Sequence, residues 1–325
     1  MRMGLSSFLQ SQPNIFIYQR LGWKFAFYYT TVLGGLYFFF NRIERRKIKK
    51  SVHDVFTGLK SDSETRTIAW DVFRGIILHY YEKLFNAFSS AETLKTFFNI
   101  HMKDDDLTAI EKGLSKGNGV LLITGHFGGV EFIPGYLAAK NFPVTIIVRF
   151  SSSALRKISL QKASEFSARI IDVDTTPNIL KSIIENLKEN RVVITQCDEI
   201  RAWKPSKRNR ISFLGKDIHL DRTMDVLVKR VKSTIVFGLM HRERDHRYKF
   251  ITTSWEETKK VFARPAETPL GSVALNFLER YIYRYPREWY QWKQYADILT
   301  TPSFGIAVES PTSLSVLKTS LHNVS

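Results

Sequence analysis

The stretch Gly-Val-Leu-Leu-Ile-Thr-Gly-His-Phe-Gly-Gly-Val-Glu, residues 119–131, decides the fold because it joins an apolar strand to a glycine-rich turn. The four apolar residues 120–123 follow a Lys-Gly-Asn-Gly turn, a pattern typical of a buried strand. The glycines that come next let the chain turn sharply and let a substrate approach the backbone closely. His126 is therefore predicted at the end of a strand, where open α/β sheets commonly carry out chemistry.

His126 is followed, five residues later, by the carboxylate of Glu131. A histidine supported by a carboxylate is a common general-base arrangement. The spacing alone is weak evidence, because His101 and Asp106 repeat it without an apolar strand or glycines beside them. The competing interpretation is a histidine that is hydrogen-bonded in the core. The strand and the glycines favour the catalytic interpretation for His126.

Apolar segments that resemble strands recur along the chain and alternate with helical patterns. The predicted strands cover residues 119–124, 143–149, 168–173, 191–196 and 234–240. The predicted helices cover residues 63–86, 177–189, 222–232 and 269–285, and Pro286 stops the last of them. This alternation predicts an α/β fold with a central, mostly parallel or mixed sheet flanked by helices.

The amino-terminal segment predicts a membrane contact. Residues 25–40 carry no charge and eight aromatic rings, and residues 41–50 carry six cations against one acid. A run of this length is shorter than the roughly 20 residues that span a bilayer, so interfacial or re-entrant insertion is favoured. A crossing would need Arg20 and Lys24 to snorkel. The basic flank is expected on the cytosolic side, next to anionic lipid. The alternative is an aromatic core helix followed by a solvated basic face.

The composition indicates a folded protein with anionic partners. The 325 residues are 44% hydrophobic and 24% charged, which suits a sizeable core, and the net charge of +17 favours acidic lipid, an acidic carrier protein or nucleic acid. The single Cys197 excludes an intramolecular disulfide and suits a reducing compartment. We expect a membrane-contacting segment at 1–50, a catalytic domain at 51–299 and a poorly ordered tail at 300–325.

Four sequence blocks occur in a characteristic order. They are an apolar helix with a basic flank at 36–56, Gly-His-Phe-Gly-Gly-Val-Glu at 125–131, a strand that ends in Arg149, and a strand that ends in Asp198 with a Phe-x-Gly turn at 211–216. With these blocks the chain resembles, over roughly residues 15–295, the late acyltransferases of lipid A biosynthesis. This is the lauroyl and myristoyl transferase family, which is related to enzymes that acylate phosphatidylinositol mannosides.

The resemblance implies a membrane-associated O-acyltransferase with a glycerolipid-acyltransferase-like fold. It implies a bacterial inner membrane location with the catalytic domain on the cytosolic face. The acyl donor would be a thioester of acyl carrier protein or CoA, used as a co-substrate with no further cofactor. The acceptor would be a hydroxyl of a lipid A-type glycolipid precursor. Glu199 stands where the family has glutamine, and segments 219–223 and 286–292 also depart from the family pattern, which leaves the acceptor open.

His126 and Glu131 occupy the two positions that are catalytic in that family. In the expected mechanism, His126 removes the proton of the acceptor hydroxyl as its oxygen attacks the thioester. Glu131 would accept a hydrogen bond from the other ring nitrogen and fix the tautomer. Negative charge on the thioester oxygen would be stabilised by the backbone N–H groups of Gly128 and Gly129, or by Arg149.

Further polar residues follow the strand at 191–196. Asp198 and Glu199 are expected in the wall of the site, with Asp198 pairing with Arg149; an ordinary strand-end carboxylate is the alternative. No metal is expected, because no second pair of ligands follows at regular spacing. Arg201 opens a basic cluster that we expect at the rim, facing phosphorylated lipid or acyl carrier protein. Cys197 could form an acyl-enzyme, but the two adjacent acids favour a buried, unreactive thiol.

Three alternatives remain open from the sequence. The same chemistry could act on a different acceptor, such as a lysophospholipid, an aminolipid or a polyene headgroup. A basic nucleic-acid-binding protein would use the same charge, but no binding motif is recognised and residues 25–40 would have no role, so no nucleic acid is expected. A non-catalytic membrane scaffold is the third alternative.

Overall fold

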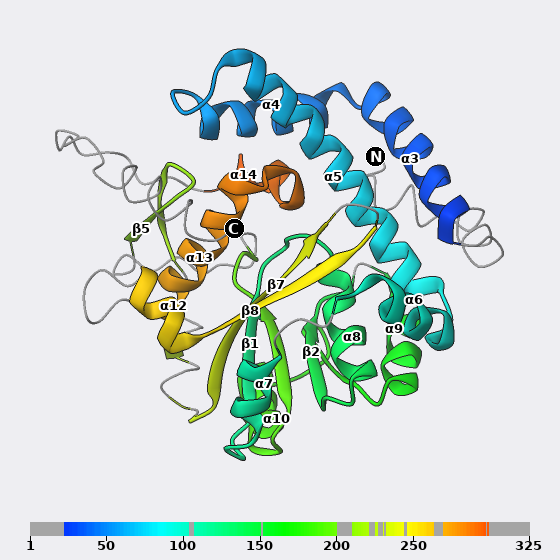
Figure 1. Ribbon diagram of the computed structural model, residues 1–325, viewed down its shortest axis with the longest axis vertical. Helices are drawn as coiled ribbons and strands as arrows, with labels where there is room; N and C mark the ends of the chain where they lie inside the picture. Colours follow the sequence, from blue (N-terminus) through cyan, green and yellow to red (C-terminus); the bar gives the residue numbers. More distant parts are fainter. Residues whose placement is uncertain are drawn as a thin grey trace.

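A computed structural model shows how the chain folds (Figure 1). It describes residues 23–103, 107–150, 152–199, 210–220, 225–226, 230, 232–243, 246–262, 269–296 and 298. The predicted tail at 300–325 and Arg201 lie outside the described residues, as does most of the helix predicted at 222–232.

A six-stranded sheet forms the centre of the molecule and confirms the predicted α/β fold. Its strand order is β3-β2-β4-β1-β7-β8. The strands are β1 (Val120–Thr124), β2 (Val144–Val148), β3 (Arg169–Asp172), β4 (Val192–Gln196), β7 (Thr234–Arg242) and β8 (Tyr248–Ser254). All neighbouring strands are parallel except β7 and β8. All five predicted strands are confirmed, and β8 adds an antiparallel edge.

Strand β1 lies between β4 and β7, and each of its residues is buried. In the register of the sheet, Leu122 lies opposite Ile194 of β4 and Val236 of β7. A strand that is covered on both faces must be apolar along its whole length, which explains the unbroken Val-Leu-Leu-Ile run. The sheet therefore fixes the end of β1, and with it His126, in the interior of the fold.

Helices cover both faces of the sheet and extend beyond one end of it. They are α5 (Asp62–Phe88), α6 (Ala91–His101), α7 (Thr108–Leu114), α8 (Ile133–Ala139), α9 (Ser153–Glu165), α10 (Ile179–Lys188), α12 (Trp255–Phe262), α13 (Leu270–Arg284) and α14 (Trp292–Tyr295). The predicted helices at 63–86, 177–189 and 269–285 are confirmed as α5, α10 and α13. A short hairpin of β5 (Arg210–Phe213) and β6 (Lys216–His219) lies outside the main sheet.

The long helix α5 has a well-defined start. The Ser61 side chain accepts a hydrogen bond from the Glu64 backbone N–H, and the Glu64 carboxylate accepts one from the Ser61 backbone. This reciprocal capping box satisfies two donors that a helix start leaves unpaired. Farther along, Gly75 lies so close to the 3₁₀ turn η3 (Pro286–Glu288) that an added Cβ would sit 1.7 Å from the Arg287 carbonyl oxygen. Only glycine allows this contact between the two backbones.

Two amino-terminal helices pack against α5. They are α3 (Trp23–Phe40) and α4 (Arg42–Phe56), and α4 continues through the domain boundary predicted at residue 50. Gly34 of α3 faces Ile77 of α5, and an added Cβ would lie 2.7 Å from the Ile77 side chain. The ring of Phe56 in α4 packs near that of Trp292 in α14. The two helices are therefore joined to the rest of the protein by close packing.

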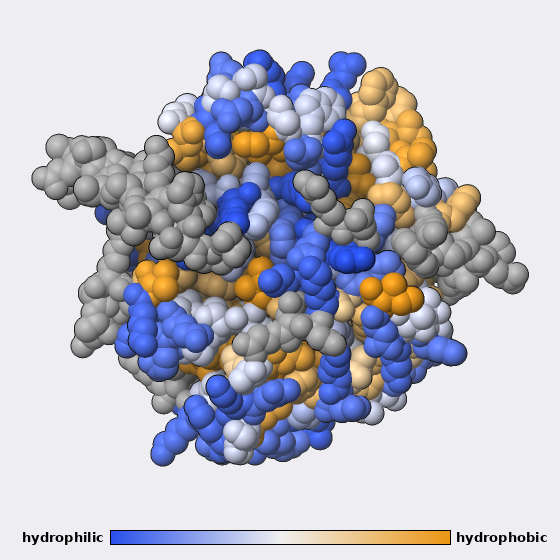
Figure 2. Space-filling view, in the orientation of Figure 1, coloured by the Kyte–Doolittle hydropathy of each residue, from blue (hydrophilic) through white to orange (hydrophobic). Residues whose placement is uncertain are grey.

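Helix α3 has two apolar faces. One face is buried against the core through Ala26, Thr30 and Phe38. The other face is exposed and forms an apolar surface, visible in Figure 2 as the orange area at the upper right, where Figure 1 places α3. This α3 surface consists of Phe25, Tyr28, Val32, Leu36, Phe39 and Phe40. Among the described helices, none is long and apolar enough to cross a membrane.

Candidate active site

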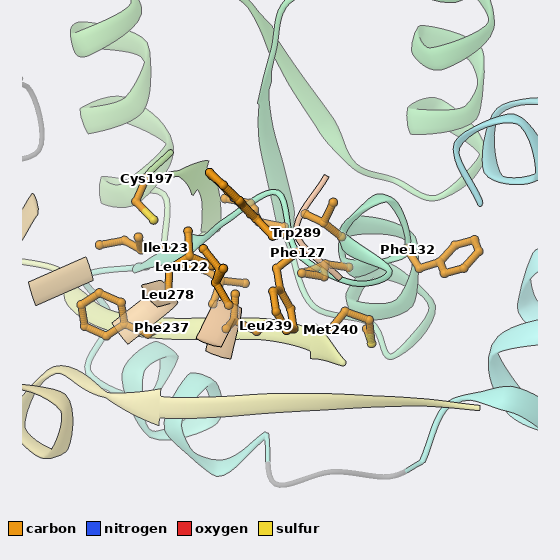
Figure 3. Close-up of a cluster of buried hydrophobic side chains, with 14 of the residues drawn as sticks. Leu122, Ile123, Phe127, Phe132, Cys197, Phe237, Leu239, Met240, Leu278 and Trp289 are labelled. Atoms are coloured by element: carbon orange, nitrogen blue, oxygen red, sulfur yellow. The ribbon is translucent and has the colours of Figure 1, made fainter. Parts of the chain in front are cut away.

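The turn after β1 is shaped by glycines that lie in close contact with neighbouring elements. Gly128 has a positive φ of 58°, and an added Cβ would lie 1.7 Å from the carbonyl oxygen of Met240 in β7. An added Cβ on Gly125 would lie 2.7 Å from the Leu278 side chain of α13. Figure 3 shows the apolar cluster around this turn, in which Phe127 lies near Trp289 and Met240. This packing holds His126 in one position.

His126 is buried and faces Asp198, which is completely buried. Its Nδ1 lies 2.9 Å from Asp198 Oδ1. The His126 backbone N–H also donates to the Asp198 carboxylate, at 3.0 and 3.1 Å, and the Trp289 indole Nε1–H donates to Oδ2 at 2.7 Å. A buried carboxylate needs such donors to stay charged. Asp198 therefore fixes the ring and holds a proton on Nδ1.

The predicted hydrogen bond between Glu131 and His126 is wrong. Glu131 lies in the 3₁₀ turn η1 (Val130–Phe132), and its Oε1 is 3.7 Å from both His79 Nε2 and Lys83 Nζ of α5. The turn carries the Glu131 side chain past the histidine and toward α5. Among the described residues, the carboxylates in contact with the His126 ring are those of Asp198 and Glu199. Glu131 nevertheless lines the same cavity as His126.

The sheet register explains why Asp198 takes this role. Thr124 of β1 lies opposite Gln196 of β4, and the two strands are parallel. His126 and Asp198 each come two residues after this pair, so they meet at the same edge of the sheet. The sequence contained this signal, because both predicted strands end in polar residues at the same offset and parallel strands place their carboxyl ends together.

The second ring nitrogen of His126 also has an acidic neighbour. Nε2 lies 3.3 Å from Oε1 of Glu199, whose side chain is 51% exposed. Burial lowers the pKa of His126, but the charge of Asp198 and its hydrogen bond, with a further contribution from Glu199, outweigh this and raise the pKa to about 10. The ring between the two carboxylates is therefore stabilised in its protonated form.

Two aromatic side chains lie beside the histidine. The Tyr290 ring contacts the His126 ring edge-on, with centroids 4.8 Å apart, and the His79 ring stacks on Tyr290. Burial, reinforced by Lys83, lowers the pKa of His79 well below its usual value, so His79 is neutral near pH 7. Burial also raises the pKa of the Tyr290 hydroxyl well above its usual value. These rings exclude water from one side of His126 without adding charge.

A cavity of about 590 Å³ opens beside His126. Its polar lining includes His126, Glu131, Glu199 and Lys83. Its apolar lining includes side chains from β2, from α9 and the residue that follows it, and from β3 and β4. Among these side chains are Ile146, Ile147, Leu155, Phe166, Ile170 and Ile194. The volume lies within the range of small-molecule sites, roughly 300–1,000 Å³. A cavity that joins reactive polar groups with apolar side chains suits a ligand that carries both a polar group and a hydrocarbon chain.

Gly128, Gly129 and Arg149 were predicted to stabilise the thioester oxygen, and the structure gives a different result for the two glycines than for the arginine. The backbone N–H of Gly128 donates to the Glu288 carbonyl at 2.9 Å, and that of Gly129 donates to the Met240 carbonyl at 2.8 Å. Both donors are already used to hold the turn, so their predicted role toward the thioester oxygen is wrong. Arg149 does line the cavity. Its Nε pairs with Asp174 at 3.2 Å, which corrects the predicted pairing with Asp198.

A buried ion pair beneath the turn was not foreseen. Arg242 of β7 donates to both carboxylate oxygens of Glu82 in α5, each at 2.7 Å, and its Nη2 also donates to the Gly128 carbonyl at 2.7 Å. The Tyr248 hydroxyl donates to the same carboxylate, and the Arg242 backbone N–H donates to Glu288. The network therefore ties α5, β7 and β8 to the turn that carries His126.

Cys197 is the thiol that could offer other chemistry near the site. Burial, with a further effect of Asp198, raises the pKa of the Cys197 thiol well above its usual value, which disfavours an acyl-enzyme on this residue. Within the ranges that the structure describes, no three His, Cys, Asp or Glu side chains gather to hold a metal ion. The contact of the His126 ring with Asp198 favours acid–base chemistry at His126.

The chain matches the model of a known protein family. The model of the bacterial lipid A biosynthesis acyltransferase family matches residues 15–291. The match includes the β1 turn, His126, Asp198 and every cavity-lining residue except Gln294. A search of curated proteins found no match.

Proposed function

The chain belongs to the bacterial lipid A biosynthesis acyltransferase family and is thus an acyltransferase, and on that premise we propose its reaction. The protein transfers a fatty acyl group from the thioester of acyl carrier protein or CoA to a hydroxyl of a lipid A-type glycolipid precursor. The observation that supports this proposal is the contact between His126 and Asp198 beside a cavity that polar and apolar side chains line together.

The proposed proton transfers follow from the positions of the ring nitrogens. Asp198 keeps the Nδ1 proton in place, so Nε2 is the nitrogen that accepts the proton of the acceptor hydroxyl. The hydroxyl oxygen attacks the thioester carbonyl carbon, and the carbon–sulfur bond breaks as the tetrahedral intermediate collapses. His126 then gives the proton to the departing thiolate. Asp198 stabilises the imidazolium that exists between these two steps.

The cavity supports the choice of a fatty acyl donor. The apolar side chains of β2, β3, β4 and α9 remove a hydrocarbon chain from water, which is favourable by about 0.8 kcal/mol for each buried methylene group. The cations Lys83, Arg149 and Lys162 also line the cavity. They suit the phosphate of a phosphopantetheine arm, which acyl carrier protein and CoA share.

The α3 surface supports a membrane-associated enzyme. Exposed aromatic and aliphatic side chains of α3 are followed by exposed cations of α4, namely Arg42, Arg46, Lys47, Lys49 and Lys50. An apolar surface on α3 next to cations on α4 suits a membrane contact in which α3 lies in the lipid interface and α4 faces anionic headgroups. In this arrangement the catalytic domain lies on the cytosolic side of a bacterial inner membrane.

The membrane contact is tested by adding charge to the α3 surface. The double variant Val32→Glu/Leu36→Glu is expected to bind anionic vesicles at least tenfold more weakly in a co-sedimentation assay, because two apolar side chains are lost and two acids are added. Val261→Glu is the matched control, because Val261 is equally exposed but lies on α12. Equal weakening by the control, or no weakening by the double variant, would contradict the membrane contact.

The reaction itself is tested by lipid analysis. Mass spectrometry of lipids from cells with and without the gene is expected to show one lipid class that lacks an acyl chain when the gene is absent. The mass difference identifies the chain length, and the lipid class identifies the acceptor. The same chemistry on a different acceptor would be shown if the missing chain belonged to a phospholipid, an aminolipid or a lipid with a polyene headgroup. Unchanged lipids would count against the proposal.

A further inference from the structure

The Glu199 carboxylate occupies the position that a substrate hydroxyl must reach. In the proposed reaction, Nε2 of His126 accepts the hydroxyl proton, yet Glu199 Oε1 lies 3.3 Å from this atom. Glu199 also lines the cavity beside His126. An acceptor hydroxyl within hydrogen-bond distance of Nε2 would have to displace the carboxylate.

The contact fixes the protonation of the ring. An ionised carboxylate only accepts hydrogen bonds, so a ring that is held between Asp198 and Glu199 carries a proton on each nitrogen. Such an imidazolium has no lone pair with which to take a proton from the acceptor. The resting arrangement is therefore stable but is not the form that acts as a base.

The two carboxylates differ in their freedom to move. Asp198 is completely buried and accepts hydrogen bonds from the ring and backbone of His126 and from Trp289. Glu199 is half-exposed, and its described ion pair is with His126. Rotation of Glu199 into solvent restores its hydration, whereas Asp198 would lose several donors at once. Release of the ring must therefore proceed through Glu199.

The other titratable groups near the His126 ring do not supply the negative charge that keeps the ring protonated. On α5, His79 is neutral near pH 7, and Lys83 lies 3.7 Å from Glu131 of η1. The Tyr290 hydroxyl stays protonated because of its burial. Asp198 and Glu199, both following β4, supply the negative charge at the ring nitrogens.

We propose that Glu199 is a positioning residue that keeps His126 protonated until the acceptor displaces it from Nε2. This inference rests on the proposed function of His126 as the base. As Glu199 withdraws, the Nε2 proton is released to water, which leaves a neutral His126 whose Nδ1–H still donates to Asp198. The ring then takes the acceptor proton and gives it to the thiolate. After product release the ring regains a proton from water.

The arrangement protects the acyl donor from water. A neutral His126 next to a bound thioester would activate a water molecule as readily as a hydroxyl, and the thioester would be hydrolysed. Because Glu199 keeps the ring protonated while the acceptor is absent, the base becomes active only when the correct group is present. Control of hydrolysis is therefore the expected consequence of the Glu199 contact.

The inference is tested first by the titration of His126 itself. Nuclear magnetic resonance of the histidine rings is recorded against pH in the whole protein, and the His126 signal is identified by its loss in His126→Ala. In Glu199→Gln, the midpoint of this titration is expected to fall by about one pH unit or more, because an opposite charge beside Nε2 is removed. Glu185→Gln is the control, since Glu185 is an exposed acid on α10 that pairs with Lys181. An unchanged midpoint in Glu199→Gln would overturn the inference.

Activity provides the second readout. Glu199→Gln is expected to move the rising limb of the pH profile of kcat/KM to lower pH and to increase acceptor-free thioester hydrolysis, relative to acyl transfer, by about tenfold. A hydrolysis-to-transfer ratio equal to that of the wild type would contradict the inference. The titration does not depend on turnover, so a wild-type protein that shows the expected titration but transfers no acyl group would contradict the proposed function alone.

Discussion

Replacing His126 with alanine is expected to lower kcat for acyl transfer by about 10²–10⁴-fold, because the group that removes the hydroxyl proton is lost. Asp198→Asn is expected to cause a loss of similar size. It removes the negative charge that fixes the Nδ1 proton and stabilises the imidazolium. The measurement is the steady-state rate with purified acyl carrier protein thioester or acyl-CoA and lipid acceptor, after thermal melting has shown that each variant is folded.

Glu131→Gln is the informative comparison for this prediction. The carboxylate lines the cavity but contacts His79 and Lys83 rather than His126. A partly exposed ion pair contributes roughly 0–1 kcal/mol, so we expect a loss of less than about tenfold. If Glu131→Gln lost as much activity as His126→Ala while Asp198→Asn stayed active, Glu131 and not Asp198 would be the residue that supports the base.

Glu82→Gln is expected to lower the free energy of unfolding by about 3–5 kcal/mol, because it leaves the buried Arg242 guanidinium without its counter-charge. Burial raises the pKa of Glu82, and Arg242 opposes that rise, so the two charges depend on each other. The double variant Glu82→Leu/Arg242→Met is expected to be less destabilised than Glu82→Gln, because it removes both buried charges. Urea denaturation measures these differences.

An exposed ion pair serves as the control for this second prediction. Asp54 pairs with Lys50 at 2.7 Å on the surface of α4, and Asp54→Asn is expected to change the free energy of unfolding by no more than about 1 kcal/mol. Equal effects of Asp54→Asn and Glu82→Gln would mean that the buried network does not stabilise the turn. The folded fraction of Glu82→Gln should also lose activity, because Arg242 holds the Gly128 carbonyl.

The inner strands could be predicted because they are mostly apolar and largely buried. Strands β1, β2 and β4 were each found within one or two residues of their observed ends. Strand β8, Tyr-Lys-Phe-Ile-Thr-Thr-Ser, was missed because it is an edge strand whose polar residues are partly exposed. Strand β8 forms through its antiparallel hydrogen bonds to β7, which the sequence of β8 alone does not indicate.

The position of His126 was predicted, whereas Asp198 was placed in the wall of the site and not against the His126 ring. The strand and the glycines at 119–129 are local features, so the histidine was located correctly at the strand end. Asp198 lies 72 positions farther along the chain, and only the parallel register of β1 and β4 brings it to the ring. Arg242 and Glu82 are 160 positions apart and share no pattern, because a buried ion pair depends on how a helix packs on a sheet.

The backbone contact between Gly75 and Arg287 has a consequence for the proposed membrane contact. Through it, α5 joins the α3 helix on one side to the segment with Trp289 and Tyr290 on the other. Because α5 packs against both α3 and η3, the proposed insertion of α3 in lipid would set the height of the His126 imidazole above the headgroups. Under that proposal the acceptor lipid rises out of its leaflet to react, and its reach selects which hydroxyl is acylated.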